Sequence, residues 1–378
     1  MSTVKAWKHV LVLGAAGPAG YNVCLSLLRA GAHVTGQDSN AYHRALLERS
    51  LTRYDGKPQQ DGRFRGCVES LSAAMGHATQ GDYDLVIAQP DVLVRELAIS
   101  RKVVPTILPP EGQLRTCGDK MLTADALPDN IRPQWATQLR SDAEAWCRLR
   151  QGAGSQGSFR GTREKCYAYI RAFDDQHRGH EWMVQEYLPG PEFACQLVYW
   201  KGLPHAYQSR ERVEYDDPNV FTGQSSSPSV QRIPDRATAD EVSFVAEQAV
   251  EATLTGRELA HGVYGVAMRR DNNGDLRVTE VNAGRFYTTT MFLTTNGLNL
   301  PGILVDLGNS TTVLPEKHFN PLKAGTTWVR QIDMGTTTMS PYAAAAAATT
   351  YLQWSEMDSL TTPSLSPDSS TSESELDE

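Results

Sequence analysis

The chain has 378 residues, a length that suggests two or three domains with ample cores. Seven of its 44 acidic residues lie in residues 351–378, which hold no Lys or Arg, so the other 37 acids nearly balance the 36 bases. A body this close to neutral argues against a broad basic surface for duplex nucleic acid, and no apolar run approaches the roughly 18 residues of a membrane span. The six cysteines are scattered without a CxxC pair and indicate a reducing cytoplasm.

The first hundred residues predict alternating strands and helices, and therefore a parallel sheet with helices on both faces. The strands are expected at 10–13, 33–36, 84–88 and 103–108, with helices from Pro18 and across 92–101. Between the first strand and helix, Gly14 to Gly20 has the spacing GxxGxxG, and Asp38 follows 24 residues after Gly14. This pattern is close to a dinucleotide fingerprint, but a tight turn that binds no nucleotide explains it equally well.

The pattern changes from about residue 113. We expect helices at 119–126, 163–174 and 238–254, strands at 182–186 and 192–199, and a hairpin of 263–269 with 276–282. Residues 209–232 are polar and Ser-rich and look like an active-site loop. Beyond about Thr361 we expect a disordered acidic tail, because too little apolar surface offsets the chain entropy.

The most informative stretch is Arg277 to Arg285, in which Glu280 and Asn282 share one face of a strand and Val281 points to the other. A carboxylate and an amide oxygen on one face are hard ligands that suit Mg²⁺, and Arg285 could reach a phosphate on that metal. An exposed strand edge with polar residues is the plain alternative.

Other segments could meet an anionic ligand. Arg148 and Arg150 precede a Gly-rich loop at 152–157, which fits phosphate oxygens or is a flexible surface loop. It is not a P-loop, because Ser158 stands where Lys is required. Arg210 and Arg212 precede hydroxyl-rich residues and suit an anionic substrate, although a solvated loop is nearly as good an explanation.

Taken in order over residues 9–310, these segments resemble the ATP-grasp superfamily, and most closely the stand-alone relatives of the carbamoyl-phosphate synthetase large subunit. The resemblance implies an α/β chain, α+β in its ATP-grasp part. It implies a Rossmann-like pre-ATP-grasp domain at 1–112, a two-subdomain ATP-grasp domain at 113–330, and a C-terminal extension at 331–378.

The resemblance also implies roles for individual residues. ATP would contact Lys120 and Arg148, a lid holding Gly152, Gly154 and Gly157, an adenine hinge of Glu186, Tyr187 and Leu188, and Glu192 at the ribose. Mg²⁺, with Mn²⁺ as an alternative, would bind Glu280 and Asn282, and the catalytic cations would be Arg285, Arg210 and Arg212. One position departs from the family: Ala267 stands about 13 residues before Glu280, where a further metal ligand is usual.

The function implied is that of a cytoplasmic ATP-dependent carboxylate–amine ligase that forms an acyl phosphate. Its partners would be a small carboxylate and an amine, with neither duplex nucleic acid nor membrane, and a homodimer would be reasonable. Two alternatives stay open. One is an NAD(P)-dependent oxidoreductase that uses the first Gly-rich turn and Asp38; the other is a nucleotide-binding pseudoenzyme, which Ala267 favours slightly.

Overall fold

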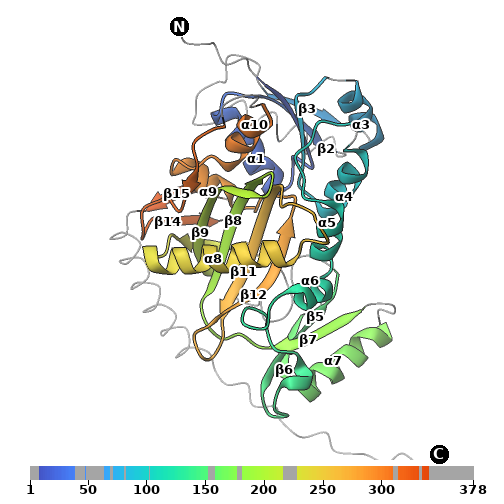
Figure 1. Cartoon of the computed structure of the whole chain (residues 1–378), viewed down its shortest axis with the longest axis vertical. Helices are drawn as coiled ribbons and strands as arrows, with labels where there is room; N and C mark the ends of the chain where they lie inside the picture. Colours follow the sequence, from blue (N-terminus) through green and yellow to red (C-terminus); the bar gives the residue numbers. More distant parts are fainter. Residues whose placement is uncertain are drawn as a thin grey trace, which may run out of the picture. The chain divides into compact units, whose positions relative to one another are not determined.

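A computed structural model describes residues 8–38, 47, 64–68, 71–80, 82–101, 103–151, 158–176, 181–215, 228–309, 314–331 and 334–339. Residues Met1–Thr338 form one compact unit and Met339–Glu378 a second. The elements below belong to the first unit, apart from the last residue of β15, and Figure 1 shows them. The predicted boundaries at 112 and 330 stay predictions. No helix in the described part of the chain is long and apolar enough to cross a membrane.

The N-terminal sheet is parallel, with the order β3-β2-β1-β4. Its strands are β1 (His9–Leu13), β2 (His33–Asp38), β3 (Phe64–Val68) and β4 (Leu85–Ala88). Val10 and Val12 of β1 join a core with α1 (Pro18–Arg29), whereas Leu11 and Leu13 join a core with α3 (Leu71–Thr79) and α4 (Asp91–Ser100). Helices therefore pack on both faces, as the alternating pattern predicted.

Two expectations for this region were wrong. Strand β3 was not predicted from the sequence. Residues 103–108 were expected to be a strand but are irregular, although Val86 N donates to Pro105 O over 2.8 Å beside β4. Pro105 lacks an N–H and therefore cannot continue a ladder.

A second, small sheet has the order β6-β5-β7, with strands β5 (Glu144–Leu149), β6 (Phe159–Thr162) and β7 (Trp182–Glu186). Helix α7 (Arg163–Gln176) packs on it through aromatic side chains: the Tyr169 ring stacks on Phe159 with centroids 4.7 Å apart. Two short helices, α5 (Glu111–Cys117) and α6 (Lys120–Ala126), and the turn η2 (Ala136–Gln138) precede this sheet in the chain.

The largest sheet runs in the order β12-β11-β8-β9-β10-β14-β15, with β13 (His318–Phe319) beside β9. Its other strands are β8 (Glu192–Trp200), β9 (Leu203–Tyr215), β10 (Pro228–Arg232), β11 (Gly262–Arg270), β12 (Leu276–Ala283), β14 (Thr327–Gln331) and β15 (Met334–Met339). The segment 209–232, expected to be a loop, is thus strand at both ends, and Arg210 and Arg212 lie on β9. The predicted hairpin of β11 and β12 is confirmed, and Gly274 in its turn has φ +87°.

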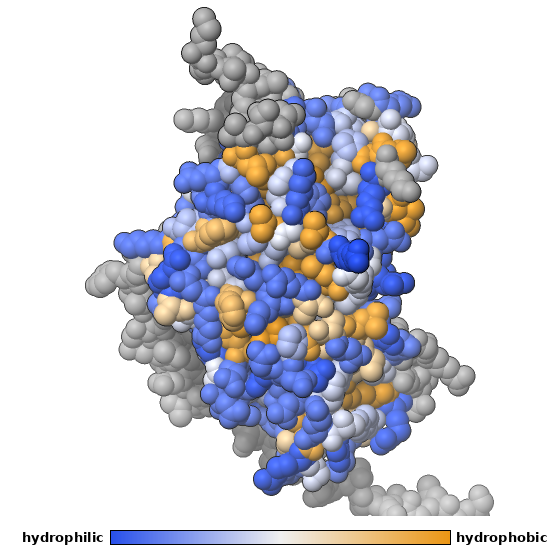
Figure 2. Space-filling view, viewed as in Figure 1, coloured by the Kyte–Doolittle hydropathy of each residue, from blue (hydrophilic) through white to orange (hydrophobic). Residues whose placement is uncertain are grey.

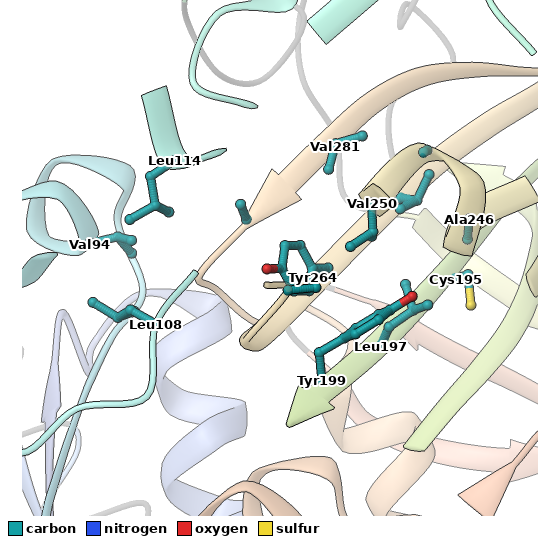
Figure 3. Packing of buried hydrophobic residues seen from close by; sticks show 14 of the residues in the cluster. Val94, Leu108, Leu114, Cys195, Leu197, Tyr199, Ala246, Val250, Tyr264 and Val281 are labelled. Carbon is teal, nitrogen blue, oxygen red and sulfur yellow. The ribbon is translucent and has the colours of Figure 1, made fainter. Parts of the chain in front are cut away.

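Helix α8 (Arg236–Ala252) covers one face of this sheet and contacts β8, β9, β11 and β12. Figure 3 shows Val250 and Ala246 of α8 over Leu197, Cys195 and Val281 of the strands. Polar side chains cover most of the molecular face on which α8 lies, with small hydrophobic groups between them (Figure 2). Beyond β12, α9 (Thr290–Thr295) and α10 (Leu300–Asn309) pack against α1.

Candidate functional site

Glu280 and Asn282 lie on β12 with their side chains on the sheet face away from α8. Val281 between them is 1% exposed and belongs to the core under α8, which confirms the expected alternation. Across the β11–β12 pairing, Glu280 stands opposite Ala267 and Asn282 opposite Gly265. The position that would bring a second metal ligand next to Glu280 is therefore occupied by a methyl group.

Four cationic side chains act on Glu280. Burial raises the pKa of this carboxyl, but Lys120, Arg285, Arg148 and Arg212 together hold its pKa below the ordinary value. The effect is mutual. Burial lowers the pKa of Lys120, and Glu280 acts against that shift. Burial likewise lowers the pKa of Arg148, with Glu280 again opposing the shift. An ionised carboxylate thus sits within a surplus of positive charge, which is an environment that favours anionic ligands.

Arg285 has two partners. Its Nη2 donates to Asn282 Oδ1, and its Nε lies 2.6 Å from Asp91 Oδ1 at the start of α4. The sequence reading assigned no role to Asp91, which lies far from Arg285 along the chain. The Asn282 oxygen faces a guanidinium, so Arg285 must move aside if that oxygen is to bind a metal ion.

Lys120 is placed by a small buried network. Asp119 caps α6 by accepting from the N–H groups of Met121 (3.0 Å) and Leu122 (3.3 Å), and Arg150 Nε lies 2.6 Å from Asp119 Oδ2. Lys120 N donates to Arg150 O over 3.0 Å. Arg150 also pairs with Glu181 over 2.9 Å. In this structure Arg150 pairs with Asp119 and so helps to hold the start of the Lys120 helix, and a phosphate contact for Arg150 stays a prediction.

We expect Asp119→Ala to lower the Tm by about 3 °C or more, because the cap and the partner of Arg150 are both lost. Asp119→Asn keeps a good cap and loses only the charge, so its Tm should fall less. Both variants should bind MgADP more weakly than the wild type in a calorimetric titration, because Lys120 loses its fixed starting point. Equal Tm values for Ala and Asn would show that capping contributes nothing here.

Arg148 bridges the small sheet and β12. It lies on β5, and its Nη2 donates to Gln185 Oε1 over 3.2 Å and to Thr279 O over 2.8 Å. Its Nε is buried and has no hydrogen-bond partner among the described residues. This leaves a donor beside Glu280 that an added anion could use.

The predicted adenine hinge lies at the end of β7. Glu186 N donates to Gln134 O over 2.9 Å, and Tyr187 N donates to Glu144 O over 3.1 Å. The Tyr187 ring is covered by the Arg160 guanidinium, whose carbon lies 3.9 Å from the ring centroid. Two N–H groups of the hinge are thus already bonded within the protein, which leaves Leu188 N–H and the hinge carbonyls as the groups that could meet an adenine edge.

Glu192 and Arg212 form an ion pair between neighbouring strands, β8 and β9. Arg269 Nε lies 3.8 Å from the other Glu192 oxygen. Glu192 is therefore engaged by two arginines and is not a free acceptor for ribose hydroxyls. Arg210, two residues before Arg212, is 1% exposed, and its guanidinium carbon lies 4.7 Å from the centroid of the Tyr287 ring.

The predicted lid glycines, Gly152, Gly154 and Gly157, lie outside the described residues, as do residues 216–227 of the Ser-rich segment. Within the described part of the chain, no group of three or more His, Cys, Asp or Glu could hold a metal ion. Glu280 and Asn282 are only two side-chain ligands, so they fit Mg²⁺ if phosphate and water complete its shell. The sequence also gave no sign of Tyr287, which the fold places between Arg210 and Arg212.

Two glycines of the first Gly-rich turn are closely packed against the protein. A Cβ on Gly14 would lie 2.5 Å from Pro90 Cδ, and a Cβ on Gly20 would lie 2.1 Å from Gly14 O. Gly14 has φ +74°. The glycines are therefore required by close packing and backbone conformation, which supports the plain alternative of a tight turn.

No protein-family model matches the sequence, and the search of curated proteins finds no match. Solved structures do match. The biotin carboxylase–β,γ-ATP complex from Campylobacter jejuni aligns with TM-score 0.59 and 13% identity over 85% of this chain and 74% of that one. An ADP complex of PurK, N5-carboxyaminoimidazole ribonucleotide synthetase, aligns with TM-score 0.60 and 14% identity over 87% and 83%. An L-amino acid ligase from Bacillus licheniformis aligns with TM-score 0.55 and 17% identity over 85% and 78%.

A structure described as a putative ATP-grasp superfamily protein from Archaeoglobus fulgidus aligns with TM-score 0.56 and 13% identity, over 88% of this chain and 98% of that one. These alignments span most of both chains. The protein therefore has the ATP-grasp fold, and the prediction made from the order of its motifs is confirmed.

Proposed function

We propose that this protein is an ATP-dependent ligase that joins a carboxylate to an amine through an acyl phosphate. The observation that carries the proposal is the cluster around Glu280, where Lys120, Arg148, Arg285 and Arg212 converge from separate elements on one carboxylate. A triphosphate and a carboxylate repel each other, and such a cluster would screen that repulsion. Solved structures of the same fold hold ADP or an ATP analogue and include ligases.

The nucleotide would lie between the small sheet and β12. Arg148 and Lys120 would contact its phosphates, with the unpartnered Arg148 Nε as one available donor. Leu188 would meet the adenine edge, and the lid at 152–157 would close over the phosphates and exclude water. Glu192 would bind ribose only after exchanging its pairing with Arg212.

Glu280 and Asn282 would hold Mg²⁺ together with phosphate oxygens, and the bound ion would supply neutralisation of the charge that develops during phosphoryl transfer. The reaction would begin when a carboxylate oxygen attacks the γ-phosphorus and ADP leaves. An amine would then attack the acyl carbon and release phosphate. Arg285, once moved from Asn282, would stabilise the transferring group, while Arg210 and Arg212 would orient the carboxylate.

The test compares ligands by thermal shift. We expect MgADP to raise the Tm by several degrees and NADPH to leave it unchanged, because Pro90 packs against Gly14 at the start of the first Gly-rich turn. Phosphate release from ATP in the presence of pooled amino acids and carboxylates would then distinguish a ligase from the pseudoenzyme that Ala267 favours. Stabilisation by NADPH alone would reject the proposal in favour of an oxidoreductase.

The setting proposed for this activity is the cytoplasm, since the scattered cysteines suit a reducing compartment. All of the free cysteines Cys24, Cys147, Cys166 and Cys195 are buried, and the Cys117 side chain is partly buried. Burial raises the pKa of Cys195 to about 12, so this thiol stays protonated and unreactive at neutral pH.

A further inference from the structure

The face of the large sheet that carries Glu280 holds a second polar cluster, three strands away. We call Arg210, Gln196, Tyr287 and Gln231 the donor cluster. Their side chains are at most 9% exposed. Each has a buried polar atom that finds no hydrogen-bond partner among the described residues: Arg210 Nε and Nη1, Gln196 Nε2, Tyr287 Oη and Gln231 Nε2. Buried polar atoms are rarely left unpaired, so the cluster requires an explanation.

Strand register brings these residues to one face. Arg210 stands opposite Ala194, Gln196 is two residues from Ala194 on β8, and Gln231 stands opposite Arg212 on the strand beyond. The segment after β12 covers them from above. A Cβ on Gly265 would lie 2.5 Å from the Tyr287 ring, so this ring rests on β11 beside Gln196.

The same segment fixes the two amides. Thr290 Oγ1 lies 3.1 Å from Gln196 Oε1, and Thr289 Oγ1 lies 3.4 Å from Gln231 Oε1. Each amide therefore has one atom anchored and the other left without a partner. Two adjacent threonines thus hold two glutamines in fixed orientations, which is the pre-organisation that a binding site needs.

Arg210 has two nitrogen atoms without a hydrogen-bond partner among the described residues, more than any other member of the donor cluster. No carboxylate of the described residues pairs with it, and its neighbours are a second guanidinium, Arg212, and the Tyr287 ring. Burial lowers the pKa of Arg210 to about 10, so it is still charged at neutral pH. Burying a guanidinium without an anion is unfavourable. A site that keeps such a charge is one in which a ligand supplies the anion.

The row from Glu280 to Arg210 shows what size of ligand fits. Its members are Glu280, Ala267, Ala194 and Arg210 on four neighbouring strands, and the Tyr287 ring rests on β11 beside this row. With about 4.8 Å between strands, the two end Cα atoms are roughly 14 Å apart. Ala267 and Ala194 are 3% and 0% exposed, so a ligand that spans this row would lie against them beneath the segment that carries Tyr287.

We propose that the donor cluster binds a second, non-reacting anionic group of the carboxylate substrate, and that the substrate is a small dicarboxylic acid or another acid with two anionic ends. This rests on the proposed ligase function. One carboxylate would face the cluster at Glu280, where phosphoryl transfer takes place, and the other would accept from Arg210 and the adjoining donors.

The test uses succinate and glutarate as probes, with butyrate and valerate as partners of the same chain length that lack one carboxylate. Binding to the full-length protein is measured by calorimetry and thermal shift, with and without MgADP. We expect each dicarboxylate to bind at least about 10-fold more tightly than its monocarboxylate partner. Arg210→Gln should remove this preference, whereas Arg232→Gln, which changes a half-exposed arginine paired with Glu211, should keep it.

A second measurement separates binding from a structural role. Without ligand, Arg210→Gln should have a Tm equal to or above that of the wild type, because an unpaired buried charge is removed. A lower Tm together with an unchanged succinate preference would overturn the proposal, as would equal binding of succinate and butyrate to the wild type. Failure of MgADP binding would instead reject the ligase function, and the nucleotide-free titration would still report on Arg210.

Discussion

Glu280→Gln is expected to reduce MgATP-dependent turnover by on the order of 10³-fold or more, while the protein remains folded. The substitution keeps the size of the side chain and removes its charge. Glu280 is the carboxylate on which Lys120, Arg285, Arg148 and Arg212 act, so its loss removes both a metal ligand and the anion that orders these cations. Turnover is followed by phosphate release once the carboxylate and amine are known, and before that by slow release from ATP alone.

A matched control is available on the same sheet. Glu211 on β9 also pairs with an arginine: Arg232 Nη2 lies 2.5 Å from Glu211 Oε2. Glu211 lies on the face of β9 opposite Arg210 and Arg212. Glu211→Gln should leave turnover within about twofold of the wild type. Circular dichroism and Tm establish that both variants fold. Full activity in Glu280→Gln would remove the metal assignment.

The fold could be predicted where the spacing of apolar residues along a segment matches that of a helix or a strand. The strands at 182–186 and 192–199, the helix from Pro18 and the β11–β12 hairpin were all predicted within a few residues. The strand β9 was missed because both of its faces carry buried polar residues: Ser209 and Arg210 are buried on opposite faces, so no apolar alternation marks the strand. Residues 103–108 show the opposite error. Their apolar run predicted a strand, but Pro105 lacks an N–H and cannot continue a hydrogen-bonded ladder.

The sequence indicated candidate residues for the site, but not the partners with which their side chains pair. Lys120 and Arg148 act on Glu280 in the structure, two residues from Asn282 on β12, and the roles that the resemblance implied for these four residues stay predictions. Their partners come from long-range contacts. Asp91 reaches Arg285 only through the packing of α4 beside β12. The period of a strand shows which face a residue occupies, but not which charge from a distant element will meet it.

Ala267→Glu tests the departure from the family pattern and is expected to strengthen metal binding. Ala267 stands directly opposite Glu280, and opposed side chains have Cβ atoms about 5 Å apart, so two carboxylates here can share one divalent ion. The four cations around Glu280 offset the repulsion between the two acids. The Mg²⁺ concentration that gives half of the MgADP-dependent rise in Tm should fall about 10-fold or more.

The control for this substitution is Ala267→Gln, because Ala267 is 3% exposed and any longer side chain must displace its neighbours. Glu and Gln have the same shape, so they share this steric cost, and the difference between them reports the added charge. We expect Gln to bind Mg²⁺ no better than the wild type. If Glu and Gln behave alike, the metal does not lie between β11 and β12, and the ion must be held by the nucleotide with Glu280 and Asn282 alone.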